Sequence, residues 1–173
     1  MGRARSGQIH ELRAMSQTRD RSFFVENLNS ACVLLQPKTV LEVGAPQDVQ
    51  IARSLYACAT VHTCDPFVAG VDYPVKFEDF SGPKYDLVNM TSVLDYLEDP
   101  VAGIRKAGVY GTSVLVQGRL NTYESQTFKT KWWTPTADCV KSQFPEYLPD
   151  HDVVWCRFFG YQVFSLLWRA HAR

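Results

Sequence analysis

The stretch that decides the fold runs from Thr39 to Asp48 and reads T-V-L-E-V-G-A-P-Q-D. An apolar run ends there in an acidic residue and a glycine, and Val49 to Cys58 then carries apolar residues at helical spacing. The stretch predicts a buried strand, a tight turn and a helix, as at the start of a nucleotide-cofactor fold. The turn departs from the usual G-x-G-x-G, because Pro46 and Asp48 stand where such folds place glycines.

The composition predicts one globular domain without a charge bias. The 173 residues are 46% hydrophobic and 21% charged, and Lys plus Arg equals Asp plus Glu at 18 each. This length can bury a core, and a balanced charge gives no argument for binding nucleic acid or a membrane. The five cysteines form no C-x-x-C pair and no zinc spacing, which predicts reduced thiols, no metal site and a cytoplasmic location. We expect no membrane contact, since no run could cross a bilayer and the polar N-terminus does not read as a secretory signal.

We expect two parts along the chain. Residues 1–37 are predicted to form a basic N-terminal arm, running to about Arg21, and a leading helix from Phe23 that Pro37 stops. Residues 38–173 are predicted to form the main domain. Residues 1–22 hold five arginines against two acids, an excess of three positive charges. This arm could contact RNA or an acidic protein, or it could be a solvated and mobile terminus.

Strand and helix patterns alternate after Pro37. Strands are predicted over residues 39–44, 60–65, 75–77, 85–90, 112–117, 152–159 and 161–170, and helices over 49–58, 99–107 and 134–144. Alternation of this kind implies a parallel sheet with helices on both faces. Gly160 alone separates the last two strand patterns, so we expect them to form an antiparallel hairpin at one edge of the sheet.

Three segments carry a family resemblance. They are V-L-E-V-G (Val40 to Gly44), T-C-D-P (Thr63 to Pro66) and Y-D-L-V-N-M-T-S-V-L-D-Y-L-E-D-P (Tyr85 to Pro100). With the order of elements, they resemble the class I S-adenosylmethionine-dependent methyltransferases over residues 39–170. The resemblance implies an α/β, Rossmann-like, mostly parallel seven-stranded sheet with a C-terminal antiparallel hairpin. It also implies S-adenosylmethionine as cofactor and transfer of its methyl group to a small-molecule or exposed macromolecular acceptor.

The resemblance assigns roles to residues near strand ends, where ligands of such sheets bind. Gly44 would let the backbone pass close to the cofactor. Glu42 would meet the methionine end, and Asp65 would accept both ribose hydroxyls. As an alternative, these two acids could be ordinary capping or solvent-facing groups.

The resemblance also implies contacts to the adenine and to the methyl group. The Asp79 carboxylate would receive the adenine amino group and the Phe80 ring would stack on the base. Asn89 would line the floor of the site near the methyl group. A D-F pair is also common in ordinary loops, so a purely structural role stays open for Asp79 and Phe80.

The catalytic group is not fixed by the sequence. Asp95, Tyr96 and His151 are the candidates for a base, and Tyr96 replaces a His that is frequent in the family at this place. Tyr96, with Trp132 and Trp133, could shape an acceptor pocket or could pack in the core or a lid.

Two other functions stay open. Pro46 and Asp48 could close the cofactor site, which would leave a methyltransferase-like domain without catalysis that serves as a structural or interaction subunit. A Rossmann-like fold that binds another nucleotide is the third alternative.

Overall fold

The computed structural model describes residues 5–45, 49–56, 59–120, 135–160 and 162–172. Its helices and strands, with η marking 3₁₀-helices, are α1 (Arg5–Leu35), β1 (Thr39–Val43), α2 (Val49–Ser54), β2 (Thr60–Cys64), η1 (Phe77–Asp79), β3 (Tyr85–Thr91), η2 (Leu94–Tyr96), α3 (Pro100–Tyr110), β4 (Gly111–Arg119), α4 (Ala137–Ser142), α5 (Phe144–Tyr147), β5 (His151–Phe159) and β6 (Val163–Ala170).

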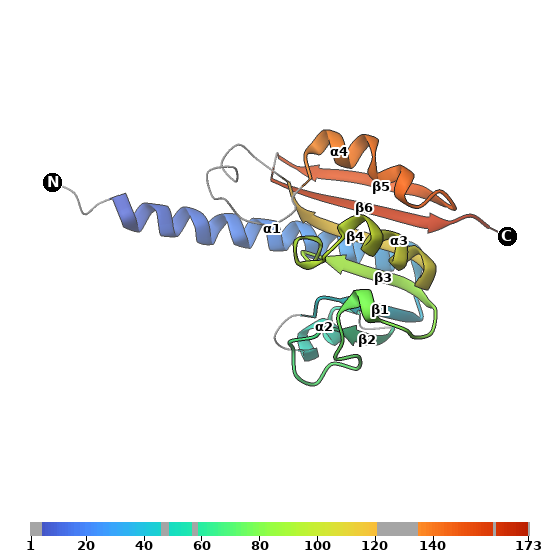
Figure 1. The fold of residues 1–173 in the computed structure, drawn as a ribbon. Coiled ribbons are helices and arrows are strands. Elements are labelled where there is room, and N and C mark those ends of the chain that lie inside the picture. The colour runs from blue at the N-terminus through green and yellow to red at the C-terminus, as the bar shows by residue number, and fades with distance from the viewer. Residues whose placement is uncertain (1–4, 46–48, 57–58, 121–134, 161, 173) are drawn as a thin grey trace.

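The sheet confirms the predicted class. Among the described residues it has six strands, in the order β2-β1-β3-β4-β6-β5 (Figure 1). The first four are parallel, and β6 runs antiparallel to both β4 and β5. The fold is therefore a mostly parallel α/β sheet that ends in an antiparallel hairpin at one edge.

The predicted count of seven strands is wrong, because residues 75–77 do not join the sheet. Tyr73 makes one isolated bridge to Cys64, and Phe77 to Asp79 then wind into η1. Pro74 between these segments has no N–H to give to a strand ladder, so the pairing does not extend.

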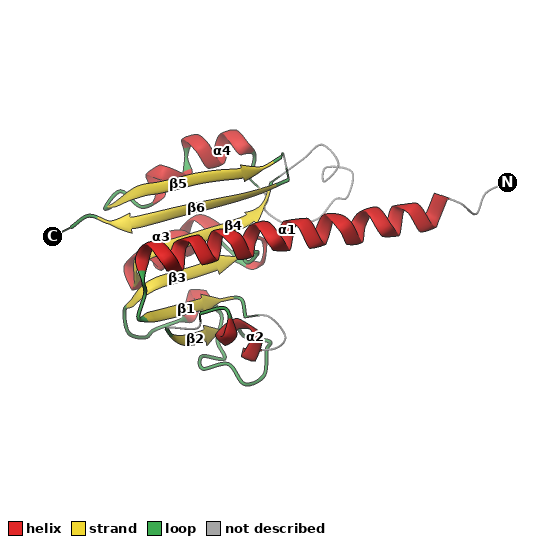
Figure 2. Ribbon diagram, turned by 180° about the vertical axis from the view of Figure 1, so that it is seen from behind, coloured by secondary structure: helices red, strands yellow, loops and turns green. Residues whose placement is uncertain are grey.

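Helices cover both faces of the sheet. α1 packs on one face through Leu28 and Ala31, and the apolar cluster there includes Val40, Leu87 and Leu115 from three neighbouring strands. α3, α4 and α5 pack on the other face. Figure 2 shows α1 lying across its face, with its first turns projecting beyond the sheet.

The leading helix begins earlier than the expected Phe23, because α1 starts at Arg5, within the predicted arm, and is 31 residues long. The sequence before Phe23 holds no proline within the helix and is rich in Arg, Gln, Leu, Ala and Met, which favour helix. α1 ends at Leu35, where Gln36 takes a positive φ of 47°. None of the helices in the described part of the chain is long and apolar enough to span a membrane.

The other predicted helices form with shifted bounds. The helix expected over residues 99–107 is α3, whose N-cap Asp99 accepts a hydrogen bond from the Ala102 N–H at 3.0 Å. The helix expected over 134–144 is two short helices, α4 and α5, and the Thr136 hydroxyl caps the first.

Candidate functional site

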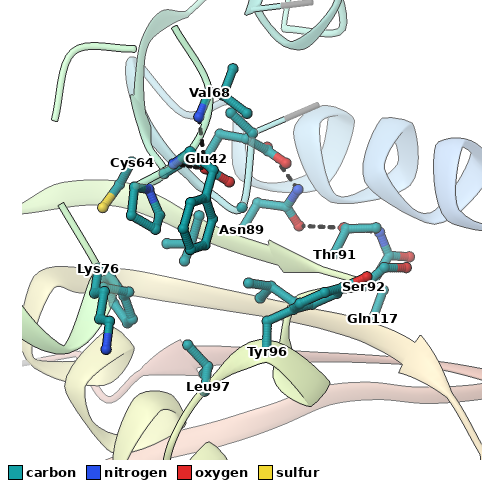
Figure 3. Close-up of a pocket in the computed structure, with 18 of the residues that line it drawn as sticks. Glu42, Cys64, Val68, Lys76, Asn89, Thr91, Ser92, Tyr96, Leu97 and Gln117 are labelled. Carbon is teal, nitrogen blue, oxygen red and sulfur yellow. Dashed lines mark hydrogen bonds between the residues drawn. The ribbon is translucent and has the colours of Figure 1, made fainter. Parts of the chain in front are cut away.

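A cavity of about 950 Å³ lies at the carboxyl ends of the parallel strands, beside α1. Its wall is built from α1, from the ends of β1, β2, β3 and β4, and from the loops that follow them (Figure 3). This is the edge at which open parallel sheets bind ligands.

The floor of the cavity is formed where the side chains along the strands change from apolar to polar. On the face toward α1, side chains alternate with a period of two, so they form rows along each strand. These rows are apolar near the strand starts and polar at the carboxyl ends. The pairs are Val40 and Glu42 on β1, Leu87 and Asn89 on β3, and Leu115 and Gln117 on β4.

Glu42 is a buried carboxyl group on this floor. Its Oε2 accepts hydrogen bonds from the Tyr56 hydroxyl and from Asn89 Nδ2, the latter at 2.8 Å. Burial raises the pKa of Glu42 to about 7, and the hydrogen bonds from Asn89 and Tyr56 oppose that rise. Glu42 can therefore change charge near neutral pH while it lines the cavity.

A row of hydrogen bonds extends from Glu42 across the floor. The Thr91 hydroxyl donates to Asn89 Oδ1 at 3.0 Å, and Gln117 Nε2 donates to Thr91 Oγ1, also at 3.0 Å. Figure 3 shows these four side chains in sequence from Glu42 to Gln117. The row fixes their orientations, since each side chain holds the next.

Gly44 directly follows β1, at the point where the chain turns beside the cavity. Its φ is +77°, in the left-handed region that glycine adopts without strain. A Cβ at this position would lie 2.8 Å from Val93 Cγ2. Glycine is therefore required here both by conformation and by space, and the backbone at Gly44 borders the cavity directly.

Asp65 directly follows β2, which is paired with β1, so it lies at the same edge of the sheet as Gly44. Its Oδ1 accepts hydrogen bonds from the N–H groups of Phe67 at 2.7 Å and Val68 at 3.1 Å. These bonds use one carboxylate oxygen to hold the loop, and Oδ2 takes part in neither of them. Asp65, Phe67 and Val68 all line the cavity.

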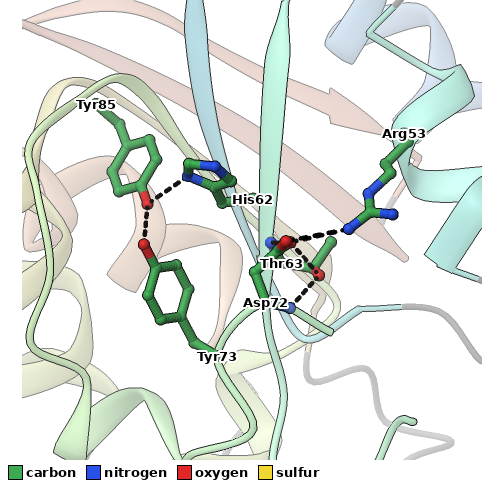
Figure 4. Close-up of polar contacts among 6 residues, drawn as sticks. All are labelled: Arg53, His62, Thr63, Asp72, Tyr73 and Tyr85. Carbon is green, nitrogen blue, oxygen red and sulfur yellow. Dashed lines mark hydrogen bonds and ion pairs between the residues drawn. The ribbon is translucent and has the colours of Figure 1, made fainter. Parts of the chain in front are cut away.

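The far end of that loop is clamped by Asp72. Its Oδ2 accepts from the N–H of Thr63 at 2.8 Å and from the Thr63 hydroxyl at 3.0 Å, and its carboxylate pairs with Arg53 at 3.1 Å (Figure 4). Because Thr63 belongs to β2, the clamp fixes the loop that carries Asp65 to the sheet.

His62 lies within β2 and takes part in a short row of side-chain contacts. Its Nδ1 lies 3.0 Å from the Tyr85 hydroxyl, which donates to the Tyr73 hydroxyl at 3.1 Å (Figure 4). This chain ties the loop after β2 to the start of β3.

Asp79 and Phe80 do not line the cavity. Phe80 is 1% exposed, and its ring packs in the core at 4.9 Å from the rings of both Tyr73 and Tyr110. Asp79 lies exposed in η1. The predicted adenine contacts of this pair are therefore not available in the structure. Phe77 and Glu78 border the cavity in their place.

The three candidate bases are not brought together. His151 begins β5 and lies 3.4 Å from the carbonyl oxygen of Gly111, the first residue of β4. That is the amino end of the parallel strands, so the proposed role for His151 is wrong. Asp95 is half-buried in η2 and is not among the cavity-lining residues, whereas Tyr96 lines the cavity and is 67% exposed. Pro46, Asp48, Trp132 and Trp133 lie outside the described residues.

Sequence reasoning missed Tyr56, Gln117 and the part of α1 that borders the cavity. Gln117 carried a signal, since it is a polar residue at the end of a predicted apolar strand. Tyr56 carried none, because a tyrosine near the end of a short helix reads as packing. Among the residues that the structure describes, no three His, Cys, Asp or Glu side chains are placed to hold a metal ion.

By sequence, no protein-family model and no curated protein matches this chain. By structure, it is similar to the N-methyltransferase NodS from Bradyrhizobium japonicum WM9 in complex with S-adenosylhomocysteine, with a TM-score of 0.64 and 13% identity, over 88% of this chain and 86% of that one. The plantazolicin methyltransferase BpumL, in complex with the same compound, gives a TM-score of 0.64 and 10% identity over 98% and 92%.

The chain has the class I methyltransferase-like fold. The dimethyltransferase RosA from Streptomyces davawensis extends the likeness at a TM-score of 0.59, but this chain spans only 60% of that protein. At 10 to 14% identity the similarity shows the fold alone. In this methyltransferase-like fold the inserted antiparallel strand is β6, between β4 and β5.

Proposed function

We propose that the cavity binds S-adenosylmethionine and that the chain transfers its methyl group to a small or exposed acceptor. The observation that carries the proposal is the place of Gly44, Glu42 and Asp65 around one cavity at the carboxyl ends of β1 and β2. The complexes of NodS and BpumL with S-adenosylhomocysteine support a ligand of this type in the fold.

The cavity fits a cationic ligand better than a polyphosphate. Its lining holds four carboxyl groups and two cations, namely Glu42, Asp65, Glu78, Glu98, Arg21 and Lys76. Lys76 is already paired with Glu98, its Nζ lying 2.6 Å from Oε1. S-adenosylmethionine carries a positive sulfur and no phosphate, so an acidic lining suits it. The same lining disfavours a nucleotide with a charged pyrophosphate, which would need cations or a helix N-terminus.

Four residues of the site have a defined part in the proposal. The bare Cα of Gly44 leaves room for the ligand, and Asp65 Oδ2 accepts from ribose hydroxyls while Oδ1 keeps its loop in place. Glu42, held by Asn89, faces the positively charged end. The bound cofactor supplies a methyl group on a sulfonium, which an acceptor attacks in line. The contribution of the chain is mainly to position the two reactants.

Thermal unfolding with and without S-adenosylhomocysteine tests the proposal. At a hundredfold excess of ligand over its dissociation constant, binding adds about 2.7 kcal/mol to the free energy of unfolding, which raises the melting temperature by several degrees. NAD at the same concentration serves as the control and should leave the melting temperature unchanged. A shift with NAD alone would instead support the alternative of another nucleotide.

A non-catalytic, structural subunit is the second candidate. The presence of Pro46 and Asp48 in the turn sequence, where related folds have glycines, favours it. It predicts no melting shift with either S-adenosylmethionine or S-adenosylhomocysteine. Contact of the basic residues in 1–22 with RNA or an acidic protein stays a prediction of either function.

A further inference from the structure

Two buried acceptor atoms lie where α1 meets the carboxyl end of β4. They are Gln117 Oε1 and Asp20 Oδ1, and neither has a hydrogen-bond partner among the described residues. Gln117 is 0% exposed and lines the cavity, and Asp20 is 7% exposed. An unpartnered buried acceptor destabilises a fold, so each of these two atoms needs an explanation.

The orientation of the Gln117 amide is fixed by its neighbours. Nε2 donates to the carbonyl oxygen of Phe24 at 3.2 Å and to Thr91 Oγ1 at 3.0 Å. A flipped amide would set two carbonyl oxygens against each other, since Phe24 O can only accept. The Thr91 hydroxyl hydrogen is already given to Asn89 Oδ1. Both Gln117 hydrogens are therefore used, and Oε1 is left to accept from something else.

Asp20 is not among the residues that line the cavity, but it lies beside them on α1, where Arg21 and Phe24 do line it. It lies four residues before Phe24 on α1, so both are on one face of the helix. Its Oδ2 is 3.9 Å from Nε of Arg119, which follows Gln117 by two residues on β4 and has a side chain that is 61% exposed. This long ion pair leaves Oδ1 without a partner. Asp20 and Gln117 thus lie on facing segments of α1 and β4, which these two contacts hold together.

Both orphaned atoms are acceptors, which defines the ligand group that fits them. A ligand must bring N–H or O–H donors, and a buried carboxylate favours donors with positive charge. A hydroxyl has one hydrogen to give, whereas a protonated secondary or primary amine has two or three. Phe24, Val25 and Tyr96 line the adjoining wall and suit an apolar body attached to that group.

We propose that the methyl acceptor is a primary or secondary amine, held by a hydrogen bond to Gln117 Oε1 and attracted by the charge of the Asp20 carboxylate at the margin of the cavity. This inference rests on the proposed function. The amine gives a proton to water before reaction, and its lone pair then forms the new N–CH₃ bond as the S–CH₃ bond breaks. The positive charge moves from sulfur to nitrogen, where the Asp20 carboxylate stabilises it. The N-methylated product leaves together with S-adenosylhomocysteine.

Three probes of nearly equal size test the inference. Benzylamine, benzyl alcohol and toluene differ in the number of hydrogens that they can donate. Their dissociation constants are measured by NMR titration on protein saturated with S-adenosylhomocysteine. We expect benzylamine to bind about tenfold more tightly than toluene, the difference that one good hydrogen bond gives, with benzyl alcohol between them.

Two variants assign that preference to the named atoms. Gln117→Met removes Oε1 at nearly constant volume, and Asp20→Asn removes the charge, so each should reduce the preference to below about threefold. Asp79→Asn is the matched control, because it removes an exposed carboxylate outside the cavity and should leave the preference unchanged. The melting shift with S-adenosylhomocysteine checks that each variant keeps its cofactor site.

The outcomes separate this inference from the proposed function. A wild-type protein that melts higher with S-adenosylhomocysteine yet binds toluene as tightly as benzylamine, or binds no benzylamine, overturns the amine site only. An unchanged preference in Gln117→Met overturns it as well, and an unchanged preference in Asp20→Asn removes the Asp20 carboxylate from the site. If no melting shift occurs, the proposed function fails. A benzylamine preference that depends on Gln117 and Asp20 in the protein alone would then still support an amine-binding site.

Discussion

Glu42 and Asn89 lie opposite each other in register on the neighbouring strands β1 and β3, and Asn89 Nδ2 donates to Glu42 Oε2 at 2.8 Å. They are 47 residues apart in the chain. β2 pairs with the other side of β1, so the strand order reverses between the strands that carry this pair. A polar contact at the carboxyl end of such a switch point marks where the sheet presents its ligand site.

The stability of the protein should depend on pH through Glu42. The unfolded carboxyl loses its proton above about 4.5, whereas the folded one keeps it up to about 7. Between these values the folded state binds more protons, so the free energy of unfolding falls as pH rises from about 4.5 to about 7, by about 3 kcal/mol. Urea unfolding at several pH values measures this slope.

Glu42→Gln keeps the shape and an acceptor oxygen for Tyr56 and Asn89 but cannot ionise. We expect this variant to lose most of the slope and to be at least as stable as wild type at pH 8. Glu26→Gln makes the same chemical change on an exposed side chain of α1 and should keep the wild-type slope. Equal slopes in all three proteins would contradict the role of Glu42.

Gly44→Ala should destabilise the protein more than Gly70→Ala does. Both glycines have nearly the same φ, +77° and +79°, so alanine costs about 1–2 kcal/mol of backbone strain at either position. At Gly44 the new Cβ also meets Val93 at 2.8 Å, while at Gly70 no atom lies within 4 Å. We expect an extra loss of about 1–3 kcal/mol at Gly44.

Chemical denaturation of the two alanine variants measures that difference. In a double-mutant cycle, Val93→Ala should recover part of the extra loss, because it removes the atom that the Gly44 methyl meets. Equal destabilisation at the two glycines would show that the Val93 side chain can move aside without a loss of stability.

Asp65 should contribute to ligand binding separately from its part in the loop. Asp65→Asn keeps an oxygen for the N–H groups of Phe67 and Val68 but puts a neutral amide where Oδ2 was. We expect its melting temperature to stay near that of wild type while its affinity for S-adenosylhomocysteine falls about tenfold or more.

Asp65→Ala should lose both the loop bonds and the affinity, so it should also melt at a lower temperature. Asp79→Asn is the control for the loss of one carboxylate outside the cavity, and it should bind like wild type. Wild-type affinity in Asp65→Asn would remove the ribose role from this carboxylate.

The sequence predicted those features that depend on local pattern. The strand over residues 39–44 and the acids at strand ends follow from the apolar run and from the chemistry of parallel sheets, and the structure places Glu42, Gly44, Asp65 and Asn89 at one cavity. The hairpin at Gly160 also follows from a local pattern, because a single glycine separates two strand patterns.

What failed depended on contacts between distant segments. The Phe80 ring packs against Tyr73 and Tyr110 in the core. No local sequence pattern shows that this ring points away from the cavity. His151 lies at the wrong end of the sheet, because β5 starts where the parallel strands start. The direction of a strand relative to a site is a property of topology, not of the residues around it.

Calorimetric titration of the full chain with S-adenosylhomocysteine tests the central claim most directly. The account predicts saturable binding of one ligand per chain, weakened about tenfold or more in Asp65→Asn and unchanged in Asp79→Asn. A folded wild-type protein that shows no binding heat and no melting shift at millimolar ligand would contradict it, and would leave a methyltransferase-like fold that serves as a structural subunit.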